Sequence, residues 1–254
     1  MDTAIVIPAA DISKNSDVML EGLMWSIVSQ GIHEEFPVII SFDGCHENFL
    51  EHFIVKYPFI HPVINKGNRS NFAGNANRGL RYAHQVLKTN AVVVNQDTIL
   101  PRPELFRAIT GPGVVSPQQV TVCELPVTQE CLDKLNQIQP KEQVIQNHTK
   151  VTGFCIFLSK ELMDKIGYFD EWYKATFEDD DICARALLAG FPVQTVSTCV
   201  HHYISKCDSY GGARLAINFS KFKYKWSIPL EISHEQCNEW ISNNHEWIEE
   251  MRCN

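Results

Sequence analysis

Apolar positions in the first hundred residues follow two alternating patterns. Short continuous apolar runs, typical of buried parallel strands, occur at residues 4–8, 37–42, 62–64 and 91–94. Between them, apolar residues recur at helical spacing in the segments 16–30, 47–57 and 73–87. Strands that alternate with helices in this way form a parallel sheet with helices on both faces. The sequence therefore predicts an α/β, Rossmann-like architecture with a mainly parallel sheet.

The pattern is less regular after the fourth predicted strand. A strand is predicted at 151–158, followed by a helix with Ser159 as its N-cap and Gly167 just past its end. The four acids at 178–181 precede an apolar helix, and a β-rich segment follows at 192–203. Weaker signals predict a short helix from Pro103, a strand at 114–115 and a helix at 128–137 within the polar, irregular segment 121–150.

The C-terminal segment has the pattern of an amphipathic helix. Ser233 and Gln236 have the spacing of a capping box. Beyond them, one helical face carries apolar side chains at Cys237, Trp240, Ile241, Ile248 and Met251. Such a stripe normally packs on its own domain, and contact with a second copy of the chain is the alternative.

Composition and charge narrow the class of protein. The chain has 254 residues, of which 44% are hydrophobic and 20% are charged, so it is long enough to bury a large core. Its net charge of -8 argues against a nucleic-acid partner, which needs a basic face. No apolar run approaches the roughly 18 residues of a transmembrane segment, and the first residues lack the basic start of a signal peptide. We therefore expect a soluble, cytoplasmic protein whose nine cysteines, an odd number without a C-x-x-C pair, are mostly free thiols.

Candidate chemistry lies directly after the predicted strands, where open α/β sheets bind their ligands. The first strand ends in Pro8 and Ala9, the second in Asp43, and the fourth is followed by Asn95-Gln96-Asp97. Two strands thus each bring one carboxylate, Asp43 or Asp97, to the same edge of the sheet. The segment 71–79, rich in glycine and asparagine, opens the third helix and would allow a ligand to approach closely, although tight helix packing favours the same residues.

Taken in order, these segments resemble the inverting, nucleotide-sugar-dependent glycosyltransferases of the GT-A fold, specifically the large family 2 with its rhamnosyltransferase-like members. The resemblance covers roughly residues 3–226. It is carried by IVIP at 5–8, SFDG at 41–44, the segment 71–79, NQDT at 95–98, GYFDE at 167–171, FEDDD at 177–181 and VHH at 200–202. It implies a GT-A domain at 1–226, with a nucleotide-sugar half at 1–100 and an acceptor and catalytic half at 101–226, and a helical extension at 227–254.

The resemblance also implies a donor site and a metal ion. The implied donor-binding residues are Pro8, Ala9, Asp43, Asn71, Asn75, Gln96 and Asp97. Asp97 is at the last position of the D-x-D-like element, which in the family holds a divalent cation on the donor diphosphate. Here that element reads Asn95-Gln96-Asp97 and has one carboxylate only. Mg²⁺ and Mn²⁺ both suit such an oxygen-rich site, and a histidine ligand would favour Mn²⁺.

The candidate histidine ligand lies in the predicted β-rich segment 192–203. Only one of the adjacent residues His201 and His202 can point toward the site, because side chains alternate along a strand. We favour His202, which has the same parity as Val196 and Val200, over His201.

Asp179 has the family's catalytic-base position in the acidic cluster. A sugar transfer with inversion needs a carboxylate that takes the proton of the acceptor hydroxyl, and crowded acids raise one another's pKa toward useful basicity. The plainer interpretation, that the acids only favour a helix start, is the one we adopt for Asp180. Acceptor-side or supporting positions are implied at Gly153, Trp172, Glu178, Asp181 and Arg185, and the last two also have the i,i+4 spacing of an ion pair.

The sequence thus predicts a glycosyltransferase that moves a sugar from a UDP or dTDP donor to a glycan or other hydroxyl acceptor. A nucleotidyltransferase shares the sheet and the metal, but it usually has a glycine-rich phosphate loop after the first strand, and residues 9–15 contain no glycine. A catalytically silent nucleotide-sugar-binding module is the other alternative, which the reduced metal motif favours and Asp179 opposes.

Overall fold

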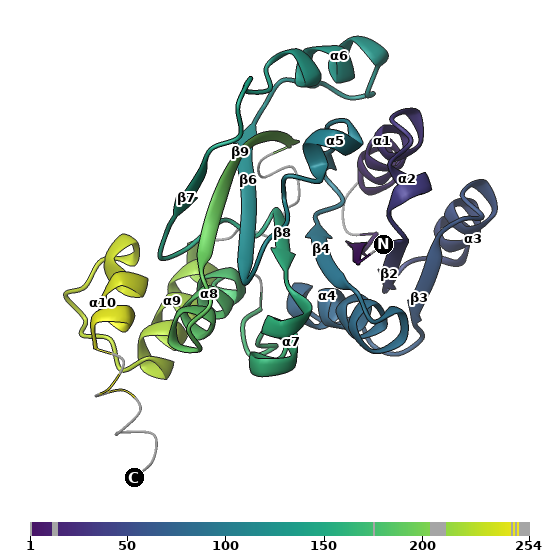
Figure 1. Cartoon of the computed structure of the whole chain (residues 1–254). Helices are drawn as coiled ribbons and strands as arrows, with labels where there is room; N and C mark the ends of the chain where they lie inside the picture. Colours follow the sequence, from purple (N-terminus) through teal and green to yellow (C-terminus); the bar gives the residue numbers. More distant parts are fainter. Residues whose placement is uncertain are drawn as a thin grey trace.

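The structure is a computed structural model that describes residues 2–11, 15–174, 176–203 and 212–244, together with 246 and 248. A single twisted sheet runs through the molecule, with helices on both of its faces (Figure 1). The strands lie in the order β3-β2-β1-β4-β8-β6-β9-β5, and β7 pairs with β9.

The first half of the sheet is parallel, as the sequence predicts. Its strands are β1 (Thr3–Ala9), β2 (Val38–Asp43), β3 (His61–Asn65) and β4 (Asn90–Val94). Each pairs in parallel with its neighbour. The connecting helices are α1 (Ser16–Ser29), α2 (Ile32–Glu35), α3 (Glu47–Lys56) and α4 (Phe72–Arg81), the last of which continues into the π-helical turn η1 (Tyr82–Leu87).

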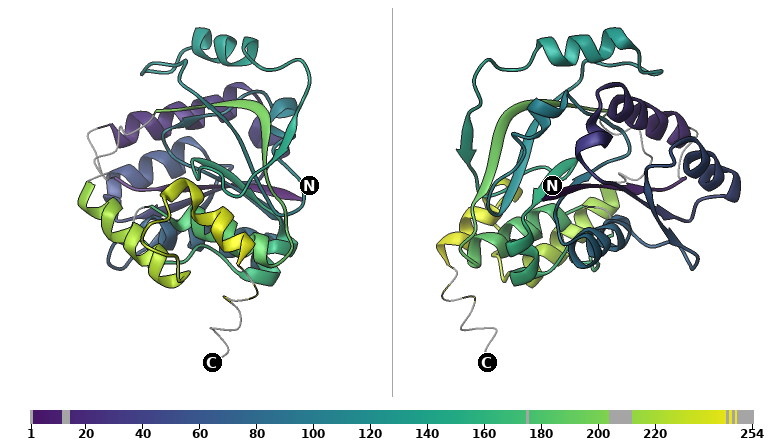
Figure 2. Two further views of the ribbon diagram at one scale, coloured as in Figure 1. Left: turned by 90° about the vertical axis from the view of Figure 1, so that its left-hand side faces the viewer. Right: turned by 45° about the vertical axis from the view of Figure 1, so that its right-hand side comes forward.

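Alternate residues of β1 belong to two different cores. Ile5 and Ile7 pack with Leu20 of α1 and Phe53 of α3 on one face. Ala4 and Val6 pack with α4 and with helices of the second half on the other face. A Cβ atom on Gly79 of α4 would lie 2.4 Å from Cγ1 of Val6, so only glycine allows this helix to lie so close to the sheet. Figure 2 shows the two helical layers.

The second half of the chain adds both antiparallel and parallel pairs to this sheet. Its strands are β5 (Thr98–Ile99), β6 (Val114–Val120), β7 (Ile145–Asn147), β8 (Cys155–Leu158) and β9 (Val193–His202). Strand β8 is antiparallel to β4 and β6, whereas β6 and β9 are parallel. The α/β, mainly parallel architecture is confirmed. The strand predicted at 151–158 begins only at Cys155, because Gly153 donates its N–H to the side chain of Asp179 instead of to a neighbouring strand.

The remaining helices are α5 (Pro103–Phe106), α6 (Gln129–Gln137), α7 (Lys160–Ile166), α8 (Glu178–Leu188), α9 (Gly212–Lys225), the 3₁₀ turn η2 (His234–Gln236) and α10 (Cys237–Asn243). The predicted N-cap of α7 is confirmed, since the Ser159 side chain accepts a hydrogen bond from Leu162 N–H. The cysteines among the described residues are free thiols, as expected.

The C-terminal segment packs on its own chain. The capping box of Ser233 and Gln236 is present at the start of η2. Cys237, Ile241 and Ile248 are buried against a cluster that includes Trp226 and Phe177. Met251 lies outside the described residues. The predicted apolar stripe is therefore covered within the molecule, and it holds η2 and α10 beside α8 (Figure 1).

Candidate active site

The carboxyl end of β2 delivers Asp43 to the predicted edge of the sheet, where the protein itself binds both carboxylate oxygens. Oδ1 accepts a hydrogen bond from Asn65 Nδ2 at 2.6 Å and forms an ion pair with Arg78 at 2.8 Å. Oδ2 accepts hydrogen bonds from the backbone N–H and the hydroxyl of Ser70, at 2.9 and 2.8 Å. Asp43 is only 1% exposed, so it organises the loop that precedes α4, and its direct contact with a donor stays a prediction.

Two side chains, Gln96 and Asn75, form hydrogen bonds with the backbone at the end of β1. Gln96 makes two hydrogen bonds with Ala10, accepting from its N–H at 2.8 Å and donating to its carbonyl at 3.1 Å. Asn75 of α4 donates to the carbonyl of Ala9 at 3.0 Å. Pro8, within β1, is buried. These residues lie together, as the sequence predicts, and they fix the loop that leaves β1.

Asn71 connects α4 to the loop before α8. Its side-chain oxygen accepts a hydrogen bond from Gly74 N–H at 2.8 Å and caps the helix. Its amide nitrogen donates to the carbonyls of Glu171 and Tyr173, at 2.6 and 2.7 Å. The same loop carries Trp172, whose side chain is 45% exposed. Asn71 therefore shapes this side of the site through contacts within the chain.

Asp97 and His202 meet where β5 pairs with the end of β9. Thr98 lies opposite His202 in this ladder, and His202 Nε2 lies 3.3 Å from Asp97 Oδ1. The other ring nitrogen of His202, Nδ1, lies 3.0 Å from Gln119 Oε1. When Nδ1 carries the proton and donates it to this amide oxygen, Nε2 keeps a free lone pair directed toward Asp97.

His201 has a different environment. Its side chain is fully buried, and Nδ1 accepts hydrogen bonds from the N–H groups of Val122 and Cys123, at 2.9 and 3.1 Å. Burial, and secondarily the neighbouring His202, lowers the pKa of His201 to about 4, so this imidazole is neutral. The structure thus places His202, the favoured residue of the pair, beside Asp97 and directs His201 into the core.

The donor set of Asp97 and His202 fits a divalent cation that also binds a ligand. One carboxylate oxygen and one imidazole nitrogen suit Mn²⁺, and Gln119 is placed to fix the ring orientation. The described ranges contain no group of three or more histidine, cysteine or acidic side chains arranged to hold a metal ion. Two protein ligands would leave the remaining coordination positions for phosphate oxygens and water.

Asp179 lies at the start of α8, directly after Phe177 and Glu178. Its Oδ2 accepts a hydrogen bond from Gly153 N–H and its Oδ1 from Asp180 N–H, both at 3.0 Å. Burial, and secondarily the charge of Asp180, raises the pKa of Asp179 to about 6. The side chain keeps some exposure, whereas Glu178, Asp180 and Asp181 are buried.

The consecutive residues Gly153 and Phe154 contact the two candidate groups, Asp179 and His202. A Cβ atom on Gly153 would lie 3.0 Å from Cβ of Asp179, so a larger residue here would push Asp179 or this backbone by a few tenths of an ångström. The ring of Phe154 stacks on His202, with 5.1 Å between the ring centroids. Two consecutive residues thus contact the predicted base and the predicted metal ligand.

The other two acids that the sequence singles out, Glu178 and Asp181, are buried inside the protein. Burial, and secondarily Asp179, raises the pKa of Glu178 to about 8, and its Oε2 has no hydrogen-bond partner in the described part of the chain. Asp181 is fully buried and pairs with Arg185 at 2.8 Å, which confirms the predicted i,i+4 contact. Lys225 and Trp226 of the C-terminal half also bind Asp181, at 2.6 and 3.0 Å.

Several partners of the acidic cluster were missed by sequence reasoning. Asp180 is bound by Lys150 and by His234 of η2, which lie far from it in the sequence. Gln119, beside His202, was also missed. These residues have no motif of their own, and only their position in the folded chain reveals them.

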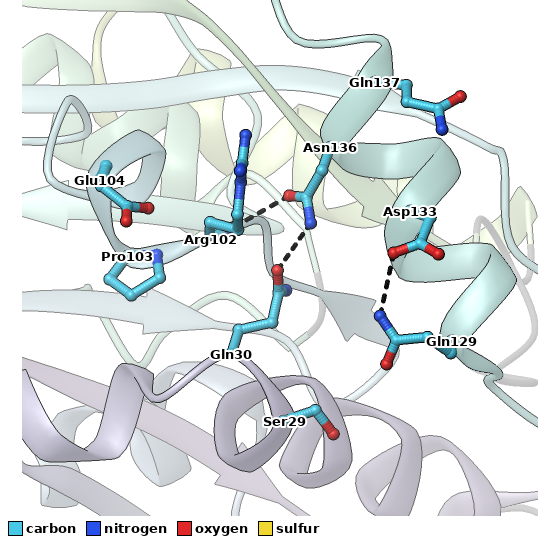
Figure 3. A pocket seen from close by; sticks show the side chains of 9 residues that line it. All are labelled: Ser29, Gln30, Arg102, Pro103, Glu104, Gln129, Asp133, Asn136 and Gln137. Atoms are coloured by element: carbon cyan, nitrogen blue, oxygen red, sulfur yellow. Dashed lines mark hydrogen bonds between the residues drawn. The ribbon is translucent and has the colours of Figure 1, made fainter.

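A polar pocket of about 660 Å³ lies apart from this site, between the ends of α1, α5 and α6 (Figure 3). Asn136 bridges it by accepting a hydrogen bond from Arg102 N–H at 3.1 Å and donating one to Gln30 at 2.8 Å. None of its lining residues belongs to the predicted site. The depression is open, and polar side chains line most of it.

Several solved structures share this arrangement of elements. GalNAc-T7, in a crystal structure with UDP, GalNAc and Mn²⁺, superposes with a TM-score of 0.62 and 12% identity over 89% of this chain and 49% of that protein. TarS of S. aureus gives a TM-score of 0.58 and 15% identity over 93% of this chain and 46% of that protein. For the TarS fragment 1–349 the TM-score is 0.57, and the match covers 94% of this chain and 78% of the fragment. These likenesses confirm the expected GT-A glycosyltransferase fold.

The sequence is also similar to that of a hexosyltransferase. The low-salt glycan biosynthesis hexosyltransferase Agl10 of Haloferax volcanii is 23% identical over 138 residues, which are 48% of this chain and 45% of that protein. The chain thus matches less than half the length of this relative. No family model matches the chain. In the described ranges, no helix is long and apolar enough to span a membrane.

Proposed function

We propose that the protein is a glycosyltransferase that moves a sugar from a UDP or dTDP donor to a hydroxyl acceptor with inversion of the anomeric centre. The observation that carries the proposal is that two consecutive residues contact the candidate base and the candidate metal ligand. Gly153 binds the carboxylate of Asp179, and the adjacent Phe154 stacks on His202, which lies beside Asp97. A general base and a diphosphate-binding pair are the two groups that such a transfer needs close together.

Asp179 is the proposed general base. With its pKa raised to about 6, the carboxylate is mostly ionised near pH 7.5 and yet basic enough to take a proton from a hydroxyl as that oxygen attacks. Two backbone N–H groups hold its orientation, so the carboxylate needs little reorganisation before reaction. Glu178 and Asp181 are buried beside it, and Trp172 offers an exposed ring on the proposed acceptor side.

Asp97 and His202 would hold Mn²⁺ or Mg²⁺. The cation would neutralise the charge that develops on the leaving diphosphate. GalNAc-T7, which is similar in fold, holds UDP and Mn²⁺ in its crystal structure, and this supports the proposal.

The loops at the ends of β1 and β2 are the proposed nucleoside site. Pro8, Ala9 and Asp43 border it, and Asn75 and Gln96 keep its backbone in place. A pyrimidine base is expected on the resemblance to family 2, because backbone and side-chain groups at these strand ends can pair with the polar edge of the ring.

A binding and turnover experiment tests this function. Calorimetry with UDP, dTDP and GDP, each with and without Mn²⁺, should show Mn²⁺-dependent binding of a pyrimidine nucleotide. Incubation with UDP or dTDP sugars and hydroxyl acceptors should then release the nucleoside diphosphate, and NMR of the product should show the anomeric configuration inverted. Tight binding of GDP alone, or retained configuration, would refute the corresponding part of the proposal. Nucleotide binding without any transfer or donor hydrolysis would favour the silent module.

A further inference from the structure

His234 contacts Phe177 and Asp180, one before and one after Asp179 in the sequence. Its Nε2 lies 3.1 Å from Asp180 Oδ2, and its ring packs on the ring of Phe177 with 4.7 Å between centroids. Phe177 has a φ of 74°, a left-handed conformation that non-glycine residues adopt only where their surroundings enforce it. The 3₁₀ turn η2 therefore supports the strained start of α8 from outside the sheet.

Lys150 and Asn238 complete this contact. Lys150 Nζ lies 3.6 Å from Asp180 Oδ1 and donates to the carbonyl of His234 at 3.4 Å. The fully buried Asn238 of α10 donates to the carbonyls of Asp180 and Thr149, at 3.0 and 2.9 Å. The segment that contains Thr149 and Lys150 continues to Gly153, whose N–H binds Asp179. The C-terminal segment and the segment before β8 are thus tied together around the start of α8.

We propose that His234 is a positioning residue for the sugar transfer. By bonding Asp180 and packing on Phe177, it keeps the start of α8 where the carboxylate of Asp179 meets Gly153 N–H. The inference rests on the proposed role of Asp179 as the base. It gives the predicted C-terminal extension a catalytic purpose that neither its amphipathic pattern nor its burial implies.

The same contact has an electrostatic consequence. The charge of Asp180 raises the pKa of Asp179, and an imidazole N–H and an ammonium group directed at Asp180 offset part of that charge. Other titratable or charged groups near this cluster are Glu178, Asp181, Lys223, Glu235 and the thiols of Cys183 and Cys237. Loss of the His234 bond should therefore raise the pKa of Asp179, whereas loss of the Asp180 charge should lower it.

Three variants of the full chain test the proposal against a matched control. His234→Phe keeps a ring on Phe177 and loses the bond to Asp180, and His234→Ala loses both contacts. Ser233→Ala weakens the capping box of the same turn without touching Asp180, and Asp180→Asn removes the charge. We expect kcat to fall about 10-fold in His234→Phe and about 100-fold in His234→Ala, with KM for the donor within about twofold and Ser233→Ala near wild type.

The pH profile separates positioning from plain stability. The acidic limb of kcat should move up by about half a pH unit in His234→Phe and down in Asp180→Asn, a pair of opposite shifts that lost stability does not produce. NMR titration of the Asp179 carboxyl carbon should show the same two shifts without any turnover. Should His234→Ala not fold, Lys150→Met provides a second test, with the same upward shift expected.

The failure of this inference is distinct from the failure of the proposed function. If Asp179→Asn abolishes transfer while His234→Phe and His234→Ala keep the wild-type kcat and pH profile, the positioning role is wrong and the base assignment holds. If Asp179→Asn transfers normally, the base assignment fails. An Asp179 titration that is the same in wild type and His234→Phe would overturn the inference in either case.

Discussion

Replacing Asp179 with Asn is the most informative single change to this site. The two carboxylate oxygens each accept one backbone N–H, from Gly153 and from Asp180. An amide keeps the size of the side chain but has one oxygen, so its NH₂ group would face one of these N–H groups. The change therefore removes the proton acceptor and one of the two hydrogen bonds.

The expected magnitudes follow from these contacts. Loss of a positioned general base should lower transfer by roughly 10² to 10⁴. The lost hydrogen bond should cost about 1–3 kcal/mol of stability. Burial raises the pKa of Asp179 to about 6, so the ionised carboxylate lowers the stability of the fold. Its removal should therefore offset part of this loss. The net change in the free energy of unfolding should stay within about 2 kcal/mol, or about 4–8 °C in Tm for a chain of this size.

The assay compares rate, binding and stability in one variant. Wild-type kcat should fall as the pH drops below about 6, because protonation of Asp179 removes the base. Asp179→Asn should be slow at every pH, while the Kd for UDP with Mn²⁺ stays near the wild-type value. Asp180→Asn is the comparison, with an expected loss of about 10-fold or less, because its amide oxygen can still accept the His234 N–H.

Two results would refute the reasoning about Asp179. Near-wild-type transfer by Asp179→Asn would show that another group takes the proton, with Glu178 and Asp181 as the next candidates. Loss of nucleotide affinity together with a large drop in Tm would show that Asp179 is structural.

Three further predictions concern the rest of the site. Asp97→Ala and His202→Ala should each weaken Mn²⁺-dependent UDP binding at least about 10-fold, and EDTA should abolish turnover; full activity in chelator would contradict the metal pair. Gly153→Ala should lower kcat about 10-fold or more with little change in Tm, because the new Cβ would lie 3.0 Å from Cβ of Asp179; an unchanged kcat would show that this contact is not critical. Glu178→Gln should raise Tm more at pH 8 than at pH 5, as differential scanning calorimetry can measure. Folding raises the pKa of Glu178 from 4.5 to about 8, so the wild type loses stability as the pH rises through this range; an equal change in Tm at both pH values would contradict the buried, protonated state.

The sequence by itself determined the local features of this protein. The strands that deliver Asp43 and Asp97 to one edge are continuous apolar runs, and the helix caps at Ser159 and Ser233 depend on residues three positions apart. The side-chain alternation along β9 also placed His202 rather than His201 on the side of Asp97. Each of these features depends on a period of two to four residues, which can be read along the chain.

Tertiary structure decided which polar groups are bound by other parts of the chain and which remain available to a ligand. Nothing in the sequence indicated that Asp43 is saturated by contacts within the chain, or that Asp180 pairs with Lys150 and His234. The strand predicted from residue 151 starts at Cys155 because Gly153 turns its N–H toward Asp179. These contacts join residues that lie more than 20 positions apart. Only the packing of α4 and α8 against the sheet, and of the C-terminal segment against α8, brings them together.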